Sequence, residues 1–375
     1  MTSELSVRSD VPRTGRAAPA LIGLVYPALV WSVHALSPFA VVLTLLAPGL
    51  CLYLAFRLAN ENRYRVATHV AYFAVGAPAL YTFLGGWLDS QKWLPFGANG
   101  VWVILWSGLL ILTAVERPKA IEEAGIRAGK LAFAHGVSAA VITTFAVFHL
   151  ANHLTGVFGG EAHMAVMRHL RLVYRQPTVE VVLLSCVLFQ VVSGAVLLLR
   201  RTRRSTVRWT EVLQNASGAY LLLFFASHVS AVLRARYLQH IDTNWIWLTA
   251  DNLLTDAWSV RLVPYYFLGV VALAVHGASG LRWVLLEHGR RQTAERAFLA
   301  TVAAGGLAAL TIVVAMVVAS LGGVSAAART KIIGDRNGGG FDGECWRLGH
   351  RPSYESCGVG GLFRAISGEG GDTVE

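Results

Sequence analysis

Long apolar stretches, separated by short polar connections, run through the chain from residue 18 to residue 321. A helix needs about 20 mainly apolar residues to cross the hydrocarbon core of a bilayer. The first block, residues 18–57, is twice that length and is interrupted between His34 and Pro38, so it predicts a helical hairpin. With the other stretches, the pattern predicts about nine transmembrane helices, the last seven near residues 66–87, 99–115, 131–155, 178–199, 212–233, 262–285 and 297–321.

The composition agrees with a lipid environment. Hydrophobic residues make up 55% of the chain and charged residues only 14%, and the mean hydropathy is +0.52. The net charge of +10 would suggest nucleic acid as a partner of a soluble protein. Here, however, the arginines gather in short connections between apolar stretches, as they do where they set membrane topology. The sequence therefore predicts an all-α polytopic membrane protein and excludes nucleic-acid binding.

The basic connections also predict the orientation, because Lys and Arg in short loops stay on the cytoplasmic side. Residues 57–65, 117–130, 200–208 and 290–296 would all lie inside, in a bacterial-type inner membrane, with the N-terminus inside and the C-terminus outside. Connection 156–177 is the exception, since it would lie outside yet carries arginines. The predicted regions are a tail at 1–17, four helices in 18–129, five helices in 130–322 and a Gly-rich outer tail at 323–375. Cys345 and Cys357 in that tail could form a disulfide in an oxidising compartment.

Histidines inside membrane spans are the first candidates for chemistry, because ionisable side chains are rare there. His149 and His228 lie at similar distances from the outer ends of their predicted spans. Two imidazoles at one depth on different helices can bind haem iron from both faces. In the alternative interpretation, each histidine forms a hydrogen bond to a neighbouring helix.

A second pair of polar residues matches in the inner half, where Gln190 and His276 are each followed four residues later by a glycine, Gly194 and Gly280. Glycine leaves room for a flat macrocycle, although small residues also serve plain helix packing. Either His276 and another ligand hold a haem, or Gln190 and His276 form a contact without metal. His135 and His69 are substitute ligands, but neither is expected to match the depth of His276.

Five stretches together resemble a known family: Phe148-His-Leu-Ala-Asn-His-Leu154, Gly159-Gly-Glu-Ala-His163, Leu188-Phe-Gln-Val-Val-Ser-Gly194, Ala226-Ser-His-Val229 and Ala274-Val-His-Gly-Ala-Ser-Gly280. In order and spacing they are similar to the five-helix cytochrome b membrane anchor of succinate dehydrogenases and fumarate reductases. The resemblance covers residues 130–322 and implies a helical bundle that binds haem b.

By the same resemblance, His149 and His228 correspond to the outer haem ligands and His276 to one inner ligand. Gln190 stands where the family's two-haem members have the other inner histidine, so one haem is favoured over two. The implied function is electron transfer between a partner dehydrogenase or reductase and the quinone pool. Flavoprotein and iron–sulfur subunits would be the partners, and this subunit would have no dehydrogenase active site of its own.

Other polar residues have two interpretations each. His153 lies one helical turn after His149, as an alternative ligand, a propionate partner or an interface residue. Connection 156–177 has the apolar pattern of an amphipathic surface helix. Its Arg168 could neutralise haem propionates or contact lipid phosphates. A competing hypothesis for the whole protein is a non-redox membrane anchor or transporter with structural histidines.

Overall fold

The computed structural model describes residues 11–36, 39–89, 96–118, 129–201, 208–255 and 258–336. Within these ranges, side chains are described except for residues 33–36, 39–41, 89, 201 and 323–336. Residues Met1–Gly323 form one compact unit and Val324–Glu375 a second. The predictions for the side chain of His34 and for the cysteines of the tail lie outside the described residues.

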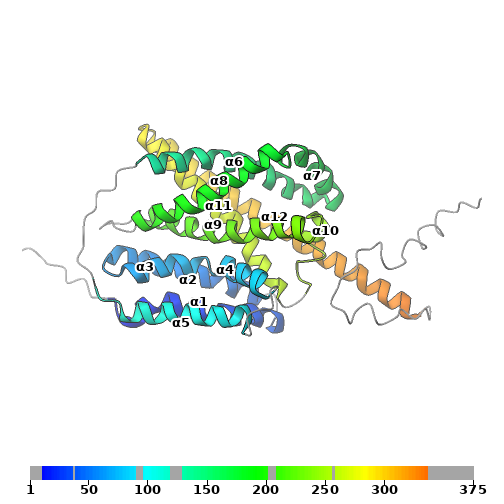
Figure 1. Ribbon diagram of the computed structural model, residues 1–375, viewed down its shortest axis with the longest axis horizontal. Helices are drawn as coiled ribbons and strands as arrows, with labels where there is room; N and C mark the ends of the chain where they lie inside the picture. Colours follow the sequence, from blue (N-terminus) through cyan, green and yellow to red (C-terminus); the bar gives the residue numbers. More distant parts are fainter. Residues whose placement is uncertain are drawn as a thin grey trace, which may run out of the picture. The chain divides into compact units, whose positions relative to one another are not determined.

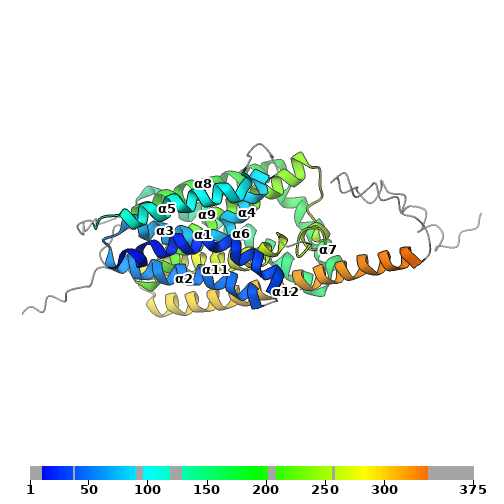
Figure 2. The same ribbon diagram turned by 90° about the horizontal axis from the view of Figure 1, so that it is seen from below.

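In the described ranges all regular structure is helical, as the apolar pattern predicts (Figures 1 and 2). The N-terminal helices are α1 (Arg13–Leu36), α2 (Phe39–Glu61), α3 (Arg65–Val75), α4 (Ala77–Leu84) with the π-helical turn η1 (Gly85–Asp89), and α5 (Gly97–Val115). The others are α6 (Lys130–Thr155), η2 (Gly156–Phe158), α7 (Gly160–Tyr174), α8 (Pro177–Arg201), α9 (Trp209–Leu233), η3 (Arg234–Leu238), α10 (Trp245–Leu248), η4 (Ser259–Arg261), α11 (Leu262–Glu287) and α12 (Arg291–Arg336).

The helix lengths make this a multi-pass membrane protein. Seven helices in the described residues are long and apolar enough to cross a bilayer, or eight if one bent pair counts as a span. The predicted hairpin is confirmed as two helices, α1 and α2. Side chains at the end of α1 are not described, so the count of nine stays a prediction.

Two stretches differ from their predicted extents. The expected span at 66–87 is two helices, α3 and α4, which are bent by 69°. Pro78, in the first turn of α4, explains the break because proline has no N–H and its ring would clash with the carbonyl of Ala74. Helix α12 continues to Arg336, beyond the expected end near residue 321.

Helix α9 lies at the centre of the bundle. It packs against α11 and α8 on one side and against α2, α3 and α4 on the other. In Figure 1, α6 and α8 lie above α9, and α1 and α5 lie below it. One apolar core therefore runs from Trp102 of α5 through Tyr220 of α9 to Tyr265 of α11. The N-terminal helices α2, α3 and α4 therefore pack against α9, the central helix of the region that carries the candidate site.

Candidate functional site

Four histidines meet at the end of the bundle that carries α7, called here the α7 end. The ring centroids of His149 on α6 and His228 on α9 are 6.2 Å apart, so the structure brings the predicted outer pair together. His153, one turn along α6, lies 4.7 Å from His149, and His163 of α7 lies 5.2 Å from His153. The surface helix expected in connection 156–177 is present as α7 and closes this end of the site.

Aromatic contacts orient the two central rings. Phe145, one turn before His149, stacks on it at 5.4 Å with 22° between the planes. Phe224 stacks on His228 at 5.3 Å with 6° between the planes. Within the described residues, neither His149 nor His228 forms a hydrogen bond. Their ring orientation is therefore set by packing, and their nitrogens are not committed to a neighbouring helix.

The separation of His149 and His228 fits an iron ion held between two imidazoles. Two metal–nitrogen bonds of about 2 Å each, together with the distance from each ligating nitrogen to the centroid of its ring, add up to roughly 6 Å between the two centroids. The four histidines contact one another in sequence, and within the described part of the chain no three His, Cys, Asp or Glu side chains are placed to hold one metal ion together, as a protein-only metal site requires. Haem needs only two axial ligands from the protein, because the porphyrin supplies four nitrogens. The donor set therefore suits haem better than a bare metal ion.

His163 is buried beside this pair, with 2% of its surface exposed. Its ring lies 4.6 Å from Trp245, and its Nε2 accepts a hydrogen bond of 3.2 Å from the Asn152 amide. Burial and, secondarily, the nearby charges of His149 and Arg171 lower the pKa of His163 to about 4. His163 is therefore neutral at pH 7.

Glycines make the close approach of Trp245 to α7 feasible. A Cβ on Gly160 would lie 2.6 Å from the indole Cδ1, too close for a real contact. Gly156 faces the other edge of the same indole. The spacing of these two glycines in the sequence is thus explained by the tryptophan that covers His163.

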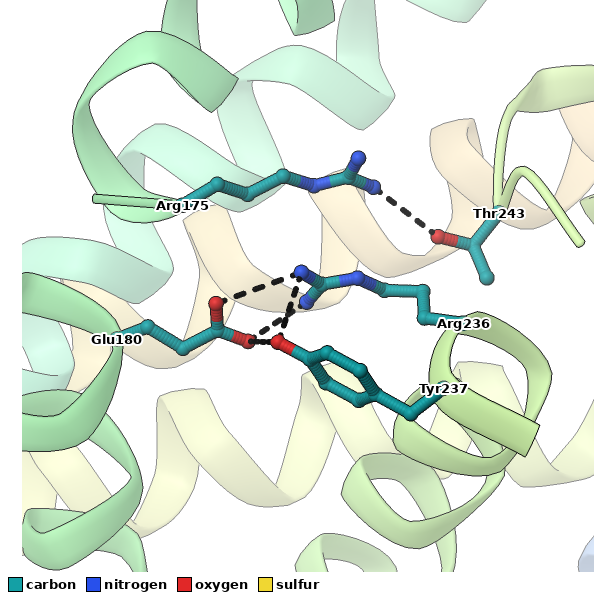
Figure 3. A network of polar contacts seen from close by, with 5 residues as sticks. All are labelled: Arg175, Glu180, Arg236, Tyr237 and Thr243. Carbon is teal, nitrogen blue, oxygen red and sulfur yellow. Dashed lines mark hydrogen bonds and ion pairs between the residues drawn. The ribbon is translucent and has the colours of Figure 1, made fainter. Parts of the chain in front are cut away.

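Arginines of α7 and of the turn that follows it lie at the α7 end. Arg168 is exposed, and the described structure shows no contact from it to the histidines. Arg171 forms an ion pair of 2.8 Å with Asp242 and donates to the backbone oxygen of Thr243. Arg175 donates to the Thr243 hydroxyl at 3.5 Å (Figure 3).

A second polar network, beside Arg175 in Figure 3, joins α8 to the end of α9. Arg236 donates to both oxygens of Glu180, at 2.7 and 3.4 Å, and the Tyr237 hydroxyl donates to the same carboxylate at 3.2 Å. The network therefore anchors the segment that follows His228.

A cavity of about 2220 Å³ runs along α6 from Lys130 to Leu154, between α6, α8, α9, α11 and α12, and it includes the opposite end of the bundle, where α6 begins. We call this the Lys130 end. The predicted inner residues all line the cavity: Gln190, His276, Gly194 and Gly280. Gln190 and His276 do not pair. The amide nitrogen of Gln190 donates to the backbone oxygen of His135 and to the Ser138 hydroxyl, each at 2.6 Å.

Instead, His276 faces His135 of α6, with ring centroids 6.4 Å apart. The expectation that His135 lies at a different depth from His276 is therefore wrong, because the helices are staggered along the bundle. His69, the other substitute, bonds through Nδ1 to the Arg65 carbonyl of its own helix. Sequence reasoning also missed Gly218, whose Cβ would lie 2.9 Å from Cε1 of His276.

No known protein family, curated protein or solved structure matches this chain. The resemblance to cytochrome b anchors therefore rests on the sequence motifs alone.

Proposed function

We propose that this protein is a haem b-containing membrane subunit that transfers electrons between a partner dehydrogenase or reductase and a membrane quinone. The observation that carries the proposal is the pair of half-buried, facing imidazoles on α6 and α9, His149 and His228, with ring centroids 6.2 Å apart. Their separation and their donor chemistry suit axial ligation of one haem iron.

When bound, haem b would supply one-electron transfer by alternating between ferric and ferrous iron. The chain's own residues hold and shield that group. His149 and His228 would bind the iron, while Phe145 and Phe224 keep both rings in orientation by stacking. At the α7 end, Trp245 packs against His163 of α7, which is buried.

The quinone and the partner subunits follow from the resemblance. A quinone is the electron carrier that dissolves in the bilayer, and the seven or eight apolar helices give this chain a large lipid-facing surface. Flavin and iron–sulfur chemistry would belong to the partner proteins.

The test is an absorption spectrum of the purified protein, with haem quantified as the pyridine haemochrome. We expect a sharp Soret band and a reduced α band from six-coordinate haem b. His149→Ala and His228→Ala should each remove this haem. His169→Ala is the matched control, because His169 is exposed on α7 and bonds to its own helix backbone. A colourless protein after expression with ample haem would refute the proposal and favour a non-redox anchor or transporter.

A further inference from the structure

Three arginine side chains lie together at the α7 end, where two membrane spans reach the surface of the bilayer. Arg171 belongs to α7, Arg175 follows this helix, and Arg236 belongs to η3. Arg175 lies two residues before the span Pro177–Arg200, and Arg236 lies two residues before the end of the span Trp209–Leu238. These three residues, called here the interface arginines, therefore lie near the level at which both spans leave the hydrocarbon core.

Carboxylates balance the charge of two interface arginines. Asp242 lies 2.8 Å from Arg171, and Glu180 lies 2.7 Å from Arg236. The two arginine side chains are only 14% and 17% exposed, so each ion pair is largely removed from water. Neither arginine therefore contributes an excess positive charge to the cluster.

Arg175 is the member that lacks a carboxylate partner. Within the described part of the chain it forms no ion pair, and its guanidinium donates one bond, to the Thr243 hydroxyl at 3.5 Å (Figure 3). This distance is longer than the roughly 2.7–3.2 Å of a normal N–H···O hydrogen bond. The Nε atom of Arg175 is buried and has no hydrogen-bond partner. A buried donor without an acceptor costs free energy, so the arrangement favours an additional acceptor at this position.

The charges around Arg175 are mainly of its own sign. Figure 3 shows its side chain beside that of Arg236. Burial and, secondarily, the positive charges of Arg171 and Arg236 lower the pKa of Arg175 from its usual value. An arginine still stays charged at pH 7. The cluster therefore carries one positive charge in excess, and a bound anion would offset the repulsion.

Hydrophobic side chains beside the cluster favour a lipid as the source of that anion. Residues next to the interface arginines and to Glu180 in the sequence are hydrophobic and more than half exposed: Leu172, Val173, Val181, Val182 and Leu238. In a membrane such side chains contact acyl chains. A phospholipid carries both groups that this surface can bind, a phosphate for the guanidinium and acyl chains for the exposed apolar residues.

We propose that Arg175 and Arg171 bind the phosphate group of an anionic phospholipid in the leaflet on the α7 side. A guanidinium binds a phosphate with two parallel charge-assisted hydrogen bonds, and the Thr243 hydroxyl, which accepts from Arg175, can donate its own hydrogen to a phosphate oxygen. A lipid with a single net negative charge balances the excess charge of the cluster. This site involves no haem and is independent of the proposed function.

Arg168 provides a matched control on the same helix. The sequence pattern offered Arg168 as a contact for lipid phosphates, but its side chain is exposed, whereas Arg175 is half-buried. A phosphate on Arg175 is thus held in a partly desolvated place, where charge-assisted bonds are stronger than in water. Binding should therefore depend on Arg175 and not on Arg168.

The experiment is native mass spectrometry of the full chain in detergent, with phosphatidylglycerol or phosphatidylcholine added. The wild type should bind phosphatidylglycerol about tenfold more tightly than phosphatidylcholine. Arg175→Gln should lower the affinity for phosphatidylglycerol about tenfold, because the bidentate contact is lost. Arg168→Gln should leave it unchanged. Inorganic phosphate should not displace the lipid, because it has no acyl chains to contact the apolar residues.

A second variant separates the charge of Arg175 from its geometry and guards against misfolding of the glutamine form. Arg175→Lys keeps the charge but loses the planar fork, so the affinity should fall about threefold while the helical circular dichroism stays unchanged. Equal binding of the two lipids by the wild type would overturn the inference. An equal loss of affinity in Arg168→Gln and Arg175→Gln would also overturn it, since that result indicates a diffuse positive surface. Displacement of the lipid by inorganic phosphate would indicate a site for free anions instead.

Discussion

The ion pair between Glu180 and Arg236 gives the clearest prediction about stability at the α7 end. The pair joins α8 to the segment that follows α9, and its side chains are only 15% and 17% exposed. Solvent-exposed pairs contribute about 0.2–1 kcal/mol, whereas breaking a fully buried pair costs about 3–5 kcal/mol. With two bonds to Arg236 and one to Tyr237, this carboxylate lies between those limits. We therefore expect Glu180→Gln to lower the free energy of unfolding by about 2 kcal/mol.

The assay is a double-mutant cycle of Glu180→Gln and Arg236→Gln, followed by unfolding in mixed micelles with increasing dodecyl sulfate. The coupling energy should be about 1.5 kcal/mol, because each single variant leaves one partner unpaired. The pair of Arg208 and Glu211 is the control, since it is 3.7 Å long and 76% and 30% exposed. Its cycle should give below about 0.5 kcal/mol. Equal coupling energies for the two pairs would refute this reasoning.

Two further predictions concern helix capping and pH. The carboxylate of Glu116 accepts bonds of 2.8 and 2.9 Å from the backbone N–H groups of Val66 and Ala67, so Glu116→Ala should lower the free energy of unfolding by about 1–2 kcal/mol. An unchanged midpoint in the same micelle assay would contradict this capping role. Burial lowers the pKa of His163 to about 4. A histidine in the unfolded chain has a pKa near 6.5, so the unfolded state binds a proton at a higher pH than the folded state does. The free energy of unfolding therefore falls as the pH decreases from about 6.5 to about 4, by up to about 3 kcal/mol. His163→Gln should make the free energy of unfolding depend less on pH between about 6.5 and 4. An equally steep decline in the variant would rule out His163 as the cause of this pH dependence.

The hydrophobic pattern alone predicted most helices, because a span must be apolar over a length that the bilayer determines. Helices α5, α6, α8, α9 and α11 begin and end within a few residues of the predicted limits. Pro78 marks the bend between α3 and α4 in the sequence, but counting apolar residues over the length of a span does not detect such a bend.

The pairing of His149 with His228 could also be predicted, since both lie near the same ends of their spans. The pairing at the Lys130 end could not, because distances from helix ends ignore the tilt and stagger of helices against one another. By that measure Gln190 matched His276, whereas in the fold Gln190 bonds to α6 and His135 faces His276.

The sequence by itself determined that this chain is a multi-pass helical membrane protein with polar residues in a few spans. These properties depend on residue type and spacing along one helix. Only the tertiary structure decided which histidines face each other, that Trp245 and α7 cover His163, and that a cavity opens beside His276. Such features arise where side chains of different helices meet. The axial stagger that brings these side chains together is set by packing between helices, so it cannot be predicted from the sequence of one span.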